Sequence, residues 1–137
     1  MSAITITAAN VVPGAGAEID RSRNAGATIT AGQVVYLDET TNTYKLADAN
    51  LSATAAVVAG IAINGASAGQ PLGVLTSGPV TIGATLVKGT IYVLGATAAG
   101  DINPAADLTT GWYRQIIGVA STTAILLVKI FNSNVTD

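Results

Sequence analysis

The chain has 137 residues, contains neither cysteine nor histidine, and carries charge on only 10% of its residues, for a net charge of −2. Its length suits one domain, and the missing residue types exclude disulfides and the Ser-His and Cys-His pairs of most hydrolases. So few basic groups cannot hold a nucleic acid backbone, and no stretch stays apolar over the length that a transmembrane helix needs.

The first 25 residues differ in composition from the rest of the chain. Residues 4–7 alternate between isoleucine and threonine, which predicts a short strand. A loose stretch of Pro, Gly and Ala follows at 13–17. Four of the 14 charged residues then lie close together: Glu18, Asp20, Arg21 and Arg23. We predict that residues 1–25 form an N-terminal arm that leaves the body of the domain.

Patterns of period two dominate from residue 26 onward. Runs rich in Val, Ile, Thr and Tyr, each bounded by Gly, Pro, Asn or Ser, predict strands. These runs lie at 33–37, 57–63, 72–76, 90–94, 113–120 and 123–131. Helical patterns are scarce, and the two candidates, at 103–108 and 47–56, are short. The sequence therefore predicts a single all-β domain over residues 26–137, built as a β-barrel or a sandwich.

The body contains an internal repeat. Residues 26–37 align with residues 83–94, and five of these twelve positions are identical. Shorter matches follow in the same order, one of them shifted by a single added residue. Colinear matches over both halves predict a duplication with a pseudo-twofold, in which 26–82 and 83–131 are copies of one β unit, followed by a short C-terminal tail. Each copy is too small to bury a face alone, so we expect the copies to share one core.

No group of residues has the spacing of a catalytic or metal site. Asp38 and Glu39 are adjacent at a strand end, where successive side chains point apart, and are interpreted as a solvated turn. Asp101, Asn103 and Asp107 lack the glycine and the closing glutamate of a calcium loop, and are interpreted as a turn and a helix cap. The sequence thus predicts no catalytic residue, no metal ligand and no cofactor, and we expect no enzyme.

Four segments of the body carry a resemblance to a known group of proteins. They are GATITAGQVVYLD at 26–38, YKLADA at 44–49, VAGIAINGASAGQP at 58–71 and PAADL at 104–108. Together they resemble small structural proteins of tailed bacteriophages, several of which are similar to capsid decoration, or cement, proteins. The resemblance covers residues 26 to about 131 and implies a β-rich protein that binds the outside of the capsid, commonly as a trimer.

We therefore predict a virion structural protein that is made in the host cytoplasm and located on the outer capsid surface. It would stabilise contacts between major capsid subunits. Its predicted partners are the major capsid protein and other copies of itself, with which it would form a trimer. We expect it to bind neither nucleic acid nor a membrane. In the arm, we predict that Ile4 and Ile6 pair along a strand and that Arg21 and Arg23 meet acidic groups of the capsid. These are the predicted contact residues.

The alternative function is that of a head-fibre or tail-associated adhesin module that binds a host glycan. Trp112 and Tyr113 form the aromatic pair that could serve as a platform for a sugar. An aromatic residue at the start of a core strand is more often part of the packing, and only 4% of the chain is aromatic. Buried rings would favour packing, whereas exposed coplanar rings would favour glycan binding.

Overall fold

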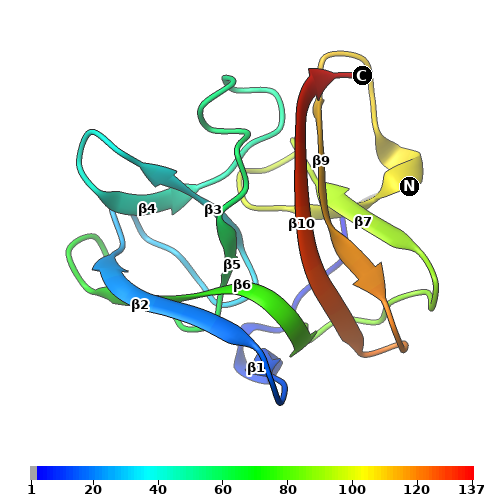
Figure 1. The fold of residues 1–137 in the computed structure, drawn as a ribbon, viewed down its shortest axis with the longest axis horizontal. Coiled ribbons are helices and arrows are strands. Elements are labelled where there is room, and N and C mark those ends of the chain that lie inside the picture. Colours follow the sequence, from blue (N-terminus) through cyan, green and yellow to red (C-terminus); the bar gives the residue numbers. More distant parts are fainter. Residues whose placement is uncertain (1–2) are drawn as a thin grey trace.

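The computed structural model describes residues 3–137, and the ten strands found there form one curled antiparallel sheet that resembles half of a barrel (Figure 1). The predicted all-β class is confirmed. The strands are β1 (Val12–Pro13), β2 (Glu18–Asn24), β3 (Val34–Asp38), β4 (Thr43–Leu46), β5 (Gly60–Ala62), β6 (Pro71–Thr81), β7 (Ile91–Leu94), β8 (Ile102–Pro104), β9 (Tyr113–Ala120) and β10 (Ile125–Thr136). Two short 3₁₀ helices, η1 (Ala8–Asn10) and η2 (Ala105–Asp107), accompany them. No helix in this described range is both long and apolar enough to span a membrane.

Strand β6 organises the sheet, because it pairs with β1, β2, β5 and β10. The order along the sheet is β4-β3-β5-β6-β10-β9-β7-β8, with β1 and β2 on β6 outside this path. Gly78 lies inside β6 with a φ of 103°, and a Cβ at this position would lie 2.7 Å from the Cα of Ala17. Only glycine adopts this conformation readily, so Gly78 allows β6 to change direction between its successive partners.

The strands β3–β6 and β7–β10, named here the first and the second unit, have the same internal order. Val34 pairs with Ile61 in the first unit, and the aligned residues Ile91 and Val119 pair in the second unit. The β3–β4 and β7–β8 hairpins pair in corresponding registers as well. This is the arrangement that the sequence repeat predicts, while the duplication and its pseudo-twofold stay predictions.

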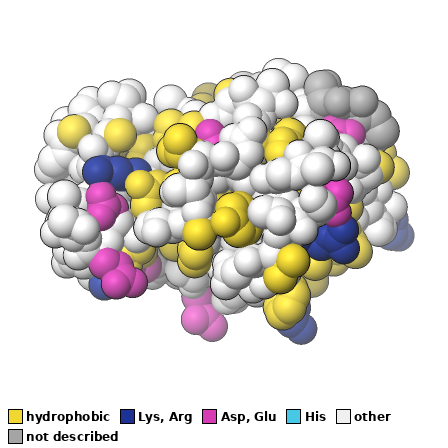
Figure 2. All heavy atoms as spheres, turned by 90° about the horizontal axis from the view of Figure 1, so that it is seen from above, with side chains coloured by type: hydrophobic (Ala, Val, Ile, Leu, Met, Phe, Trp, Pro, Cys, Tyr) yellow, Lys and Arg dark blue, Asp and Glu magenta, His cyan; other side chains and the backbone are white. Residues whose placement is uncertain are grey.

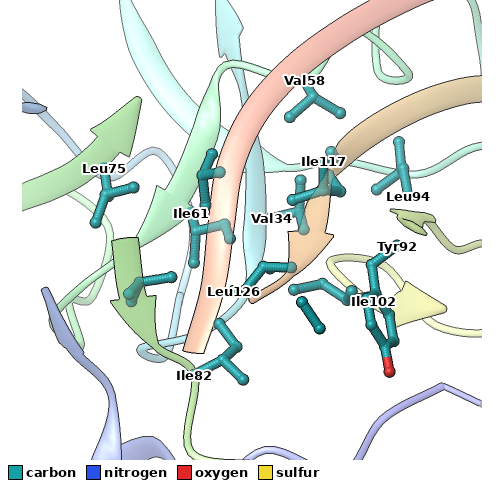
Figure 3. Close-up of a cluster of buried hydrophobic side chains, with 14 of the residues drawn as sticks. Val34, Val58, Ile61, Leu75, Ile82, Tyr92, Leu94, Ile102, Ile117 and Leu126 are labelled. Atoms are coloured by element: carbon teal, nitrogen blue, oxygen red, sulfur yellow. The ribbon is translucent and has the colours of Figure 1, made fainter. Parts of the chain in front are cut away.

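The main hydrophobic core lies between the two units. The first unit contributes Val34, Ile61 and Leu75, which pair directly across β3, β5 and β6 and are named here the first-unit row. The second unit contributes the other face of its strands, including Tyr92 and Leu126. Figure 3 shows these side chains entering one cluster. Apolar burial on this scale is the main favourable term in folding, so contact between the units stabilises both.

A second, smaller cluster covers the opposite face of the first unit. Its members come from β3, β4, β5, β6 and the loops beside them: Ala25, Ile29, Val35, Tyr44, Ala62, Ala66, Leu72 and Val74. The first unit is therefore buried on both faces, which explains why its strands read as nearly continuous apolar runs instead of clean alternation.

The N-terminal segment lies on the body, so the prediction of an arm that leaves the body is wrong for the described residues 3–25. Strands β2 and β1 of this segment pair with β6. At its start, the backbone N–H of Ile4 donates to the carbonyl of Ile102 in β8, over 3.0 Å. Just after its end, the N–H of Gly26 donates to the carbonyl of Tyr44 in β4, over 2.7 Å. The segment thus supplies partners to strand edges whose backbone groups would otherwise be unpaired.

Candidate interaction surfaces

Ile4 and Ile6, two of the predicted contact residues, are partly buried and pack against the main core. Residues 4–7 are irregular, so the predicted strand is wrong. A Cβ at Gly32 would lie 2.6 Å from Cγ2 of Ile6, which places the isoleucine directly over this glycine. Burial of both side chains holds the segment on the body. Contact of Ile4 and Ile6 with a partner stays a prediction.

The two predicted arginine contacts have different surroundings. Arg23 is engaged within the chain, because its Nη1 lies 3.1 Å from Oδ2 of Asp20 and its Nε donates to Oδ1 of Asn42 over 3.0 Å. Arg21 is exposed, and its guanidinium lies over β6, where a Cβ at Gly73 would be 3.1 Å from Nη1. Arg21 therefore offers an exposed cationic group, whereas Arg23 helps to fix the N-terminal segment.

A polar cluster beside Arg23 joins β2 to β4. The Tyr44 hydroxyl donates to Oδ2 of Asp20 over 2.5 Å. Burial of the phenol, together with this hydrogen bond, raises the pKa of Tyr44 to about 12. Hydrogen bonds from Ser22 and then from Tyr44 hold the pKa of the Asp20 carboxyl well below its ordinary value. The cluster ties the N-terminal segment to the outermost strand of the first unit.

A groove of about 560 Å³ lies between the β3–β4 turn, the loop that precedes β5 and the end of β10. Its walls combine small apolar groups with hydroxyl, amide and carboxylate groups: Leu37, Asp38, Glu39, Thr40, Ala53, Thr54, Val57, Ala59 and Asn134. The loop before β5 also exposes Leu51, with 71% of its surface accessible. A concave site that mixes apolar walls with a few polar groups is typical of ligand binding.

Side-chain amides hold the groove loop on β9 and β10. Asn132 accepts from the backbone N–H of Val58 over 2.9 Å and donates to the carbonyl of the same residue over 3.0 Å. The fully buried Gln115 donates to the carbonyl of Ala56 and to Oδ1 of Asn134, each over 2.8 Å. These side-chain amides pair with backbone groups of the loop that would otherwise need a neighbouring strand. The groove is therefore a fixed feature of the fold.

Two of the charged side chains at the groove rim form an ion pair with each other. Lys45 lies 2.7 Å from Oδ2 of Asp38, and this contact lowers the pKa of the Asp38 carboxyl and raises that of the Lys45 ammonium. Glu39, next in the chain, is exposed. The rim therefore presents a compensated ion pair beside one accessible carboxylate, and it fits an uncharged or basic group better than an acidic one.

A second surface lies on the outside of the second unit. Ile91, Val119 and Leu127 pair directly across β7, β9 and β10 and are named here the outer row. Ile91 is 46% exposed and Leu127 is 39% exposed. Pro79 of β6 pairs with Leu127 and continues the row across a fourth strand. Figure 2 shows one face of the molecule, on which hydrophobic side chains form separate patches among uncharged surface and several charged side chains.

Trp112 and Tyr113 are partly buried and pack against the main core. The backbone N–H of Tyr113 donates to the carbonyl of Ala49 over 2.7 Å, which fixes the start of β9 beside the groove loop. The two residues thus contribute to packing between the loop and the second unit. A role in glycan binding stays a prediction.

The carboxylates named from the sequence are separate features. Within residues 3–137, no three His, Cys, Asp or Glu side chains gather where they could hold a metal ion. Asn103 is buried in β8 and donates to Oδ2 of Asp107 over 2.9 Å, instead of capping a helix. Burial raises the pKa of the Asp101 carboxyl. The bond between Asn103 and Asp107 fixes the chain around η2, whereas Asp101 accepts from the N–H of Ala98 in the loop before β8.

Sequence reasoning missed both surfaces. Nothing in the composition of residues 53–59 marks them as the wall of a groove, because the opposite wall comes from β3 and β10. The outer row could have been found from the repeat, since Ile91 aligns with Val34 and both positions are apolar.

Comparison with known proteins gives no matching family model and no matching curated protein. The fold and its surfaces define the class of protein: a small, charge-poor β domain that offers uncharged surfaces on a firmly packed body.

Proposed function

We propose that this chain is a structural protein of a bacteriophage virion, which binds the outer surface of the capsid and stabilises contacts between major capsid subunits. The observation that carries the proposal is the groove lined by the exposed Val57 and Glu39, set in a body whose strand β6 is already paired with its own N-terminal segment. The resemblance of the strand-and-turn segments to phage structural proteins supports the same role.

Binding through this groove would use a preformed surface. Small residues such as Ala53 and Ala59 have little side-chain entropy to lose on docking, so a modest contact area gives net binding. Val57 would supply an apolar contact, and Glu39 would meet a basic group of the capsid. Self-association would let one oligomer of this chain bind several capsid subunits at once, so that several weak contacts together give firm attachment.

Co-sedimentation with undecorated capsids tests this proposal. The variant Val57→Asp changes a side chain that lines the groove and is 42% exposed. It should leave the fold intact while it reduces the bound fraction at least about tenfold. The matched control is Val87→Asp, since Val87 is 67% exposed and is not one of the residues that line the groove. Intact protein that neither binds capsids nor raises their temperature of disruption would overturn the proposal.

The polar lining of the groove favours one second candidate, an adhesin module that binds a host glycan. Thr40, Thr54 and Asn134 offer hydroxyl and amide groups to the hydroxyls of a sugar. Calorimetric titration with purified host surface polysaccharide separates the two candidates. Heat of binding that Thr54→Val abolishes would support the adhesin, whereas capsid binding with no response to polysaccharide would exclude it.

A further inference from the structure

The outer row and the first-unit row hold aligned positions of the two units but differ in what covers them. In the first unit, Val34, Ile61 and Leu75 are fully buried. Their counterparts, Ile91, Val119 and Leu127, lie on the outside, and the described residues leave Ile91 46% and Leu127 39% exposed. The row is apolar in both units, although only one of the two rows needs to be apolar for the chain to fold.

The structure itself shows what covers such a row. The first-unit row packs against the second unit, which presents the other face of its strands, with Tyr92, Ala120 and Leu126. One row-covering contact between β units is therefore already established within each chain. The outer row repeats the same pattern of side chains on the outside of the second unit, where residues 3–137 place no third unit.

We propose that the outer row binds the outer row of a second copy of this chain. In the alternative, a head-to-tail contact, the outer row of one copy would pack on the first unit of another copy. It would need the face of the first unit that corresponds to Tyr92, Ala120 and Leu126, which consists of Val35, Ala62 and Val74. That face is closed, because it is buried beneath residues of the second cluster, among them Ala25 and Ile29. The outer row of the partner remains open and, being uncharged, matches itself without repulsion of like charges.

The surface around the outer row suits face-to-face packing of two sheets. The row crosses β7, β9, β10 and β6 in direct register, so its side chains project from one face. Phe131 on β10 is 62% exposed and extends the apolar area along the strand, with Lys129 between it and Leu127. The methylene groups of Lys129 can cover this apolar surface while its ammonium stays in water. Two such sheets would pack about 10 Å apart, with their side chains interdigitated.

Sedimentation velocity over a range of concentrations tests the proposal on the isolated protein. The intact chain should sediment as a dimer that dissociates on dilution. Ile91→Lys and Leu127→Lys should each raise the dissociation constant at least about tenfold, because each would bury an unpaired charge at the contact. Both side chains are already partly exposed, and lysine can keep its ammonium in water, so the monomer should stay folded.

The control is Val87→Lys, a lysine substitution at a residue that is 67% exposed and outside the row. It should leave the dimer unchanged, and circular dichroism should show the same strand signal for all three variants. A monomeric intact chain, a trimer, or a dimer that Val87→Lys weakens as much as Leu127→Lys would overturn the proposal.

This inference rests on the self-association within the proposed function and assigns a dimer where the resemblance implies a trimer. Its test is separable from that of capsid binding. A monomeric Leu127→Lys variant that still binds capsids, with weaker attachment per particle, supports both proposals. An intact dimer that does not bind capsids supports the outer-row contact and contradicts the proposed function.

Discussion

The first-unit row and the outer row offer an internal comparison within one chain. Both contain three apolar residues that pair across three neighbouring strands in the same register. Leu75, at the end of the first-unit row, is fully buried, whereas its counterpart Leu127 is 39% exposed. The same local pattern is therefore buried in one place and exposed in the other, because the second unit covers the first-unit row while the outer row stays partly exposed.

This difference separates the stability of a strand from the burial of its faces. The strand order and the register of the aligned pairs correspond in both units. Burial depends on which face meets the rest of the molecule, and it differs between them. Substitutions at aligned positions can therefore be compared directly, each serving as the control for the other.

The largest expected effect comes from shortening the aligned leucines. Leu75→Ala should lower the free energy of unfolding by about 2–5 kcal/mol, because it leaves a cavity in the main core. Leu127→Ala should lower it by about 1 kcal/mol or less in the monomer, since the lost side chain is already partly solvated. Urea unfolding at low protein concentration measures both. Equal losses would contradict the contrast between the two rows.

The aligned glycines Gly60 and Gly118 should instead respond alike. A Cβ at Gly60 would lie 2.3 Å from the carbonyl oxygen of Leu75, and a Cβ at Gly118 would lie 2.1 Å from that of Leu127. Each alanine variant should lose about 1–3 kcal/mol, because backbone must shift to admit the methyl group. Gly65→Ala, where the nearest contact is 3.7 Å, is the control and should be close to neutral. A large loss at only one of the aligned glycines would show that the two units differ in backbone packing too.

The contact between the units can be weakened at the groove. Asn132→Ala should lower the free energy of unfolding by about 1–3 kcal/mol, because it leaves the N–H and carbonyl of Val58 without partners in a partly buried site. Hydrogen exchange at the Val58 amide should accelerate more than exchange in β3 or β5. The control is Gln70→Ala, which removes an exposed hydrogen bond that the Gln70 side chain accepts from the Ser67 N–H in the turn before β6. Unchanged exchange at Val58 would mean that the loop is held by other contacts.

The smallest expected effect concerns Tyr44, whose pairing with Leu37 corresponds to the pairing of Ile102 with Leu94 in the second unit. The pKa of Tyr44 is raised from 10.0 to about 12. Stability from the neutral phenol is therefore complete below about pH 10 and is lost as the pH rises through about 12. Tyr44→Phe should lose about 1 kcal/mol at neutral pH and should remove the last step of the tyrosinate absorbance titration. A titration that keeps this late step in the variant would assign it to another tyrosine.

The amino-acid sequence by itself determines the all-β class, the approximate positions of β3, β5 to β7, β9 and β10, and the shared order of the two units. These features follow from period-two patterns, turn residues and matching positions, all of which depend on neighbours along the chain. Residues 47–56 show the limit of such patterns, since their weak helical signal corresponds to turns that side chains of β9 and β10 hold in place.

Only the tertiary structure decided where residues 3–25 lie and which rows are covered. Ile4 and Ile6 alternate as a strand would, but their apolar side chains gain more by packing on a body whose β8 edge also accepts a hydrogen bond from Ile4. An alternating pattern shows that a strand has an apolar face, and it cannot show what meets that face. The groove, the outer row and the position of the N-terminal segment all depend on residues far apart in sequence, which only the folded chain brings together.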